Sequence, residues 1–109
     1  MIGRNHFVRY YDTMSSLHQA HLVVYDINKN FEKKIINLTP YLKKIRDFKD
    51  IKELAVSLRS IDGYDYVFLE NSQNDKQFAY NLDTNQFLTR DLPDYEQNSY
   101  HQNKAFHPY

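Results

Sequence analysis

Residues 38–63, LTPYLKKIRDFKDIKELAVSLRSIDG, form the one segment of this chain with a clear helical period. Five apolar residues repeat at spacings close to 3.6, which places them on one side of a helix. They are Ile51, Leu54, Ala55, Leu58 and Ile61. Asp50 and Glu53 have the spacing of a capping box, and Gly63 follows where a left-handed residue commonly ends a helix. The pattern predicts a helix over residues 51–62.

A second helix start lies earlier in the same segment. Thr39 precedes Pro40, which is the order of an N-cap and a proline at the first helical position. The segment therefore predicts a short helix over residues 40–46 followed by the longer one, and a single bent helix is the alternative. The apolar side of the predicted helix has to pack against another layer, and the strand-like runs in the rest of the chain can form a sheet that serves as this layer.

Strand-like runs flank this segment on both sides. They combine aromatic and β-branched residues and are separated by turn-forming Asn, Asp and Ser residues. The runs are residues 6–11, 20–27 and 31–38 before the segment, and 64–70, 77–82 and 86–89 after it. The predicted class is α+β: a mainly antiparallel sheet of about five to six strands in the order β-β-β-α-β-β-β, with one long or kinked helix packed on one face.

The 109 residues suit one domain, and composition changes near its end. We expect a single α+β domain over residues 1–90 and a polar, aromatic tail over residues 91–109. A mobile terminus is the default for such a composition. Its four aromatic side chains suggest partial order instead.

The chain has no cysteine, which excludes a disulfide scaffold, a thiolate zinc site and a cysteine nucleophile. The first residues, MIGRNHFVRYYD, have no apolar core of a signal peptide. No segment approaches the roughly 18–20 apolar residues of a membrane span. We expect a cytoplasmic protein without a membrane association.

Positive and negative charges are unevenly distributed, although the net charge is zero. Residues 1–59 contain 11 basic and 6 acidic residues, a net of +5, and residues 60–109 contain 3 and 8, a net of −5. Eight basic residues lie between Lys29 and Lys52. They predict either a solvated helix face and hairpin edge or a patch for an acidic partner. A pI near 7.0 disfavours a dedicated nucleic-acid binder.

No motif for catalysis or metal binding stands out. His18 and His21 would point to opposite faces of a strand, so they cannot share a metal unless the strand breaks. A loop beginning at Asp26 starts like a calcium loop, but Phe31 and Asn37 occupy the positions that need glycine and glutamate. We therefore expect no catalytic residues, no metal and no cofactor.

The composition is rich in Asn, Lys, Ile and Tyr, as in the products of AT-rich genes. A compact, cysteine-free single domain without motifs is common among small phage and mobile-element proteins, many of which bind and block a host protein. We expect a small non-enzymatic binding or inhibitor protein directed at a larger host protein or nucleoprotein, for example of a defence system. The predicted contact residues are Lys33, Lys34, Lys43, Lys44, Arg46, Lys49, Tyr95, Tyr100, Phe106 and Tyr109. Basic side chains suit an acidic partner, and tyrosine is enriched at interfaces.

Two other functions stay open on the same residues. One is a nucleic-acid-binding module that uses the patch between Lys29 and Lys52 together with aromatic stacking. The other is a small metal-free nuclease or hydrolase, since Tyr, Arg, Lys and His are all present. Homodimerisation through an exposed strand edge is compatible with each of these functions.

Overall fold

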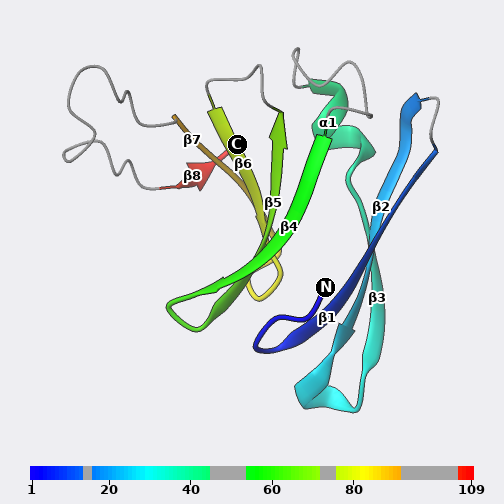
Figure 1. Cartoon of the computed structure of the whole chain (residues 1–109), viewed down its shortest axis with the longest axis vertical. Coiled ribbons are helices and arrows are strands. Elements are labelled where there is room, and N and C mark those ends of the chain that lie inside the picture. Colours follow the sequence, from blue (N-terminus) through cyan, green and yellow to red (C-terminus); the bar gives the residue numbers. More distant parts are fainter. Residues whose placement is uncertain (14–15, 45–53, 72–75, 92–105) are drawn as a thin grey trace.

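The computed structural model describes residues 1–13, 16–44, 54–71, 76–91 and 106–109, and in this part the chain forms two antiparallel sheets (Figure 1). The three-stranded sheet has the order β1-β2-β3, with β1 at His6–Thr13, β2 at Ser16–Asp26 and β3 at Glu32–Asn37. The five-stranded sheet has the order β4-β5-β6-β7-β8. Its strands are Leu54–Ile61, Tyr64–Asn71, Lys76–Asn81, Gln86–Asp91 and His107–Pro108.

The predicted α+β class with a long helix on one face of a single sheet is wrong. The chain is mostly antiparallel β-sheet, and its described helices are the six-residue α1, Thr39–Lys44, and one 3-10 turn, η1, at Ile27–Lys29. Strands occupy the regions predicted for them on either side of α1, but they belong to two sheets. The fold is therefore two β layers with a small helix between consecutive strands.

The residues predicted as the second half of a long helix form β4 instead. Val56 and Leu58 pack against the core, whereas Ala55 before them and Arg59 after them are exposed, so the segment follows a period of two. Asp62 and Gly63 have positive φ values of 53° and 85°, as a two-residue type I′ hairpin turn requires, and they join β4 to β5. Gly63 thus closes a hairpin rather than a helix, and residues 45–53 lie outside the described part.

Helix α1 lies where a short helix over residues 40–46 was predicted, with residues 45 and 46 outside the described part, and Thr39 has a different role from an N-cap. Its hydroxyl accepts a hydrogen bond from the Ala20 amide at 3.1 Å and lies 3.3 Å from the Ala20 carbonyl. The Tyr41 ring stacks on Phe87 of β7, with centroids 4.5 Å apart, and Leu42 is fully buried. The helix therefore bridges β2 and the five-stranded sheet.

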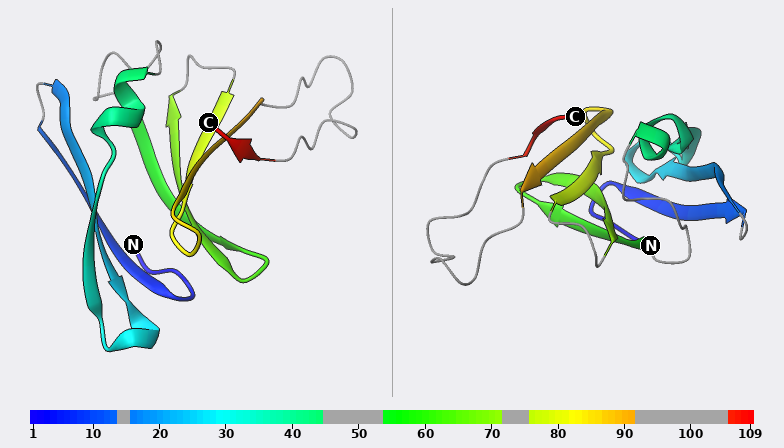
Figure 2. Two further views of the ribbon diagram at one scale, coloured as in Figure 1. Left: turned by 180° about the vertical axis from the view of Figure 1, so that it is seen from behind. Right: turned by 90° about the horizontal axis from the view of Figure 1, so that it is seen from above.

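The two sheets share one apolar core, and α1 lies at one end of it (Figure 2). The three-stranded sheet contributes every second side chain of its strands, including Val8, Leu22 and Val24. The five-stranded sheet contributes its own alternate positions, including Val67 and Phe78. This alternation leaves the opposite face of each sheet pointing away from the core.

The last residues of the chain belong to the five-stranded sheet. β8 pairs with β7, and the Tyr109 amide donates to the Phe87 carbonyl at 3.0 Å. The Phe106 ring packs against Phe68, while the Tyr109 ring meets Phe78 edge-on. In the described part of the chain, no helix is long and apolar enough to cross a membrane.

Candidate functional site

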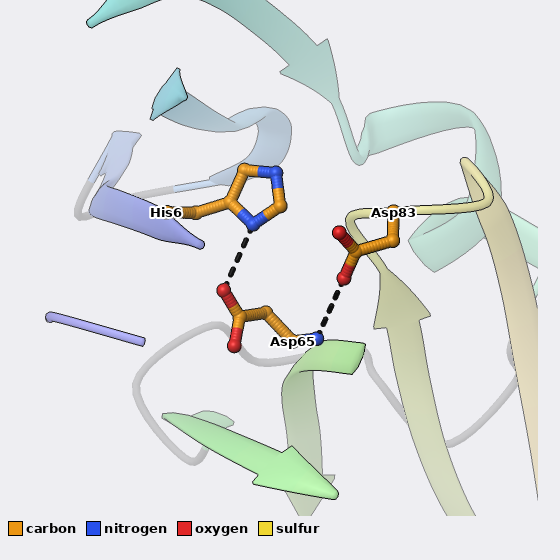
Figure 3. Close-up of side chains that lie close together, drawn as sticks. All are labelled: His6, Asp65 and Asp83. Carbon is orange, nitrogen blue, oxygen red and sulfur yellow. Dashed lines mark hydrogen bonds and ion pairs between the residues drawn. The ribbon is translucent and has the colours of Figure 1, made fainter. Parts of the chain in front are cut away.

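His6, Asp65 and Asp83 form the group of acidic and histidine side chains that most resembles a catalytic or metal centre (Figure 3). They come from the start of β1, the start of β5 and the turn after β6. One oxygen of the Asp65 carboxylate lies 2.8 Å from His6 Nδ1, and Asp83 accepts from the Asp65 backbone amide at 2.8 Å. Asp65 and His6 are 0% and 3% exposed.

Both oxygens of the Asp65 carboxylate are occupied. Oδ1 accepts from the Arg4 amide at 2.9 Å and from the Ser60 hydroxyl, and Oδ2 accepts from the Asn5 amide at 2.7 Å in addition to its contact with His6. Burial alone would raise the pKa of Asp65, but the hydrogen bonds from Ser60, His6, Asn5 and Arg4 outweigh it and hold the pKa below its usual value. The buried group is thus a fully satisfied carboxylate anion.

The segment before β1 is built to approach this carboxylate. A Cβ atom at Gly3 would lie 2.6 Å from Asp65 Cγ, so only glycine leaves room for it. The Asn5 side chain donates to the Gly63 carbonyl at 3.2 Å and to Asp83 at 3.4 Å. These contacts attach residues 3–6, which lead into the three-stranded sheet, to the turns of the five-stranded sheet.

The geometry favours a structural role for this cluster over metal binding or catalysis. One ligand atom from each of His6, Asp65 and Asp83 lies within 4.8 Å of the others. A metal would have to displace donors from Asp65, two of which are backbone amides that cannot turn away. His6 is too buried for a general base that exchanges protons with a substrate. The cluster joins the two sheets.

A different kind of candidate lies on the three-stranded sheet, on the face that points away from the core. We call it the outer face, and its nine residues follow from the strand register. The rows across β1, β2 and β3 are Phe7–Tyr25–Lys33, Arg9–Val23–Ile35 and Tyr11–His21–Asn37. None of the nine is Asp or Glu, and four are aromatic or histidine rings.

Several of these side chains are accessible. Ile35 is 63% exposed and Tyr11 is 42% exposed, and Arg9, Lys33 and Asn37 are also exposed. Tyr11 stacks on His21 across the strands, with centroids 5.4 Å apart and an interplanar angle of 16°. An exposed aliphatic, aromatic and cationic surface of this kind is typical of a binding face.

The first row completes the outer face. The Phe7 and Tyr25 rings lie 6.0 Å apart, and the Arg9 guanidinium lies 5.8 Å from the Phe7 centroid. Both rings are half-buried, so they are held in place while part of their surface faces solvent. The outer face is thus a set of positioned rings with two cations among them.

The two lysines predicted as neighbours in a contact patch point in different directions. Lys33 lies on the outer face, whereas the Lys34 amine is bonded to the Leu82 carbonyl at 3.2 Å and to the Asn85 side chain at 2.6 Å. Lys34 therefore links the two sheets. Alternation along β3 separates the pair, because successive side chains of a strand alternate in direction.

The remaining predicted contact residues are divided among three places. The backbones of Lys43 and Lys44 lie in α1, but their side chains are outside the described part, as is the side chain of His18. Arg46, Lys49, Tyr95 and Tyr100 lie outside the described residues altogether.

The two tail aromatics that are described, Phe106 and Tyr109, lie on the five-stranded sheet, away from Lys33. The Arg90 guanidinium covers the Phe106 ring at 4.3 Å, and Tyr66 stacks beside it with centroids 6.2 Å apart. Tyr109 is 50% exposed. The basic and aromatic residues predicted from the sequence as one contact region are thus placed on different surfaces where they are described.

A small pocket at the hairpin end of β2 and β3 is too small for an ordinary metabolite. It has a volume of about 150 Å³ and is lined by Val24, Asp26, Lys29, Glu32, Lys33 and Lys34. Small-molecule sites usually occupy roughly 300–1,000 Å³. Its lining also mixes three lysines with two carboxylates, so the pocket has no single sign of charge to select a ligand.

The outer face was not predicted from the sequence, although part of its pattern is visible there. Phe7, Arg9 and Tyr11 alternate along one run, and alternation predicts that they share a face. Which residues of β2 and β3 lie beside them depends on the register between the strands, and no local sequence pattern predicts that register. Comparison of the chain with protein-family models, curated proteins and solved structures gave no match.

Proposed function

We propose that this protein is a non-enzymatic binding protein that contacts its partner through the outer face of the three-stranded sheet. The observation that carries the proposal is the composition of that face, with exposed Tyr11 and Ile35, two cations and no carboxylate. Exposed aromatic and aliphatic groups supply contact area, and Arg9 and Lys33 select a partner with negative charge.

The non-enzymatic part of the proposal is supported by the state of the His6–Asp65 pair. A catalytic carboxylate or histidine needs an accessible atom for the substrate. Here the Asp65 oxygens are bonded to four donors and His6 is buried, so the pair serves the fold. The composition suggests the form that binding takes, which is inhibition of a larger host protein or nucleoprotein.

Ile35→Asp tests the proposal, with Ile61→Asp as its matched control. Both isoleucines are exposed on strands, at 63% and 41%, but Ile61 lies at the end of β4, away from the outer face. The protein and its two variants are used to capture partners from a bacterial lysate, with and without nuclease. Each retained species is then identified by mass spectrometry, purified and titrated.

We expect the purified partner to bind the Ile35→Asp variant about thirtyfold more weakly, which is the loss at a central interface residue. Binding to the Ile61→Asp variant should stay within about twofold of the unmodified protein. Equal affinity of all three forms would refute the outer face as the contact surface. Both variants should remain folded, which far-UV circular dichroism checks.

A further inference from the structure

We infer that the partner of the outer face is a single-stranded nucleic acid, whose bases stack on its rings. This inference rests on the proposed function, since it takes the nucleic acid of a nucleoprotein as the partner of the same surface. It follows from three features of the face: paired rings in fixed positions, cations between and beside them, and the absence of carboxylates among the nine residues.

The rings form two pairs, one near each end of β1. Tyr11 and His21 form one pair and Phe7 and Tyr25 the other. Tyr11 is the fourth residue after Phe7, and four steps along an antiparallel strand correspond to roughly 14 Å. A four-stranded sheet with aromatic residues on adjacent strands binds RNA by stacking two or three bases. The two ring pairs of the outer face offer two stacking positions with one row between them.

The cations lie where phosphates would pass. Arg9 is in the middle row, between the two ring pairs, and Lys33 is at the edge of the first row on β3. Both are exposed. A chain of stacked bases carries one phosphate per nucleotide, so a strand that spans the rows meets both charges.

The build of the face, a sheet surface without a helix on it among the described residues, favours single strands over duplexes. The bases of a duplex present only their edges in the grooves, and stacking requires an unpaired base. The outer face is a three-stranded surface whose described helices, α1 and η1, lie at the ends of its strands, so it presents no helix to a groove. Its net positive charge also disfavours a basic protein as partner.

The test is fluorescence anisotropy with labelled single-stranded DNA and RNA of mixed sequence, about 12 nucleotides long, which spans the usual site size. Tyr11→Ala removes one ring, and Tyr64→Ala is the matched control, because Tyr64 is 45% exposed on the other sheet. We expect Tyr11→Ala to weaken binding by about fivefold or more, and Tyr64→Ala by less than about twofold.

Two further measurements separate stacking from charge and from misfolding. Tyr11→Phe keeps the ring and should restore affinity to within about twofold of the unmodified protein. Two phosphate contacts predict a log–log salt slope of roughly −1.4, or about a sevenfold loss between 50 and 200 mM salt. Arg9→Ala should reduce that slope by about 0.7, whereas Arg59→Ala on β4 should leave it unchanged. Arg59 is the matched control because it also lies over a ring, 5.2 Å from Phe68.

Several outcomes would overturn the inference. These are no binding of either oligonucleotide, equal loss in Tyr11→Ala and Tyr64→Ala, or equal affinity for a duplex or for heparin, which has charge but no bases. If Ile35→Asp nevertheless loses an identified protein partner, the proposed function stands and only the nucleic-acid inference fails. If neither partner depends on the outer face, both fail.

Discussion

Replacing Asp65 with asparagine removes one buried charge while almost preserving the shape of the side chain. Asp65 is fully buried and accepts four hydrogen bonds, two of them from the backbone amides of Arg4 and Asn5. Asparagine has one oxygen and one NH₂ group. If the NH₂ group faces His6 or Ser60, that partner can change its tautomer or rotate and accept a hydrogen bond. A backbone amide has no such freedom.

If the NH₂ group replaces Oδ2, the Asn5 amide loses its acceptor. If it replaces Oδ1, the Arg4 amide keeps only the Ser60 hydroxyl, at 3.1 Å, as its acceptor. A buried donor without a partner costs about 1–3 kcal/mol. The remaining bonds also weaken, because charge-assisted bonds are about twice as strong as neutral ones. We expect Asp65→Asn to lower the free energy of unfolding by about 3 kcal/mol, out of roughly 5–15 kcal/mol for a domain of this size.

The pH dependence distinguishes this mechanism from a general loss of packing. The pKa of Asp65 is lower in the folded chain than its ordinary value of 3.8. The stabilisation from the carboxylate is therefore complete above that value and is lost as the pH falls through the folded pKa. The asparagine variant has no such term, so the difference in unfolding free energy between the two proteins should shrink below about pH 4.

Urea unfolding monitored by far-UV circular dichroism, in steps from neutral to acidic pH, measures both effects. Asp62→Asn is the matched control, because Asp62 lies exposed in the β4–β5 turn at a φ of 53°, where asparagine is equally suited. It should change stability by less than about 0.5 kcal/mol. A loss below about 1 kcal/mol in Asp65→Asn, or a loss that is the same at every pH, would refute the argument.

Two further substitutions test how the sheets are joined. Gly3→Ala places a Cβ atom 2.6 Å from Asp65 Cγ and should lower the free energy of unfolding by about 1–3 kcal/mol, as measured in urea. An unchanged urea midpoint of unfolding would show that the segment before β1 can shift without cost. Lys34→Met removes the bonds to the β6–β7 turn and should cost about 1 kcal/mol, whereas Lys33→Met should cost almost nothing; equal melting temperatures of the two variants would contradict this.

The strands were predictable because their cues are local. Asn30 and Asn85 adopt positive φ values of 54° and 59° in the turns that follow β2 and β6, and asparagine is among the residues that tolerate this conformation. The alternating run at residues 64–70 became β5 with Val67 and Leu69 buried. Sequence patterns predict strands and turns well, because the residues that form the pattern are the same residues that form the strand or the turn.

The helix prediction failed because two periods fit the same apolar residues. Leu54 and Leu58 are four apart, which suits both a helix and a strand. Val56 distinguishes them, since it is β-branched and lies midway, and Asp62-Gly63 is a strong hairpin turn dipeptide. These two features favoured a strand and should have outweighed a capping-box spacing.

The carboxylate cluster and the outer face could not have been assembled from the sequence. Asp65 lies about 60 residues from Arg4 and Asn5, whose backbone amides donate hydrogen bonds to it. No sequence pattern near Asp65 indicates that these amides are its partners. The outer face depends on which residues of β1, β2 and β3 lie opposite one another. Register and sheet packing are tertiary properties, so they became visible only in the structure.

The bonds between Asp65 and the segment before β1 also set the order in which a growing chain can complete its fold. A ribosome releases Arg4 and Asn5 early, but their acceptor is made about 60 residues later. The three strands of the first sheet need only their own neighbours to pair, yet Leu22 and Val24 stay uncovered until Val67 and Phe78 arrive. The segment before β1 is therefore fixed only after β5 has been made, and until then a newly made chain carries an apolar surface that chaperones can bind.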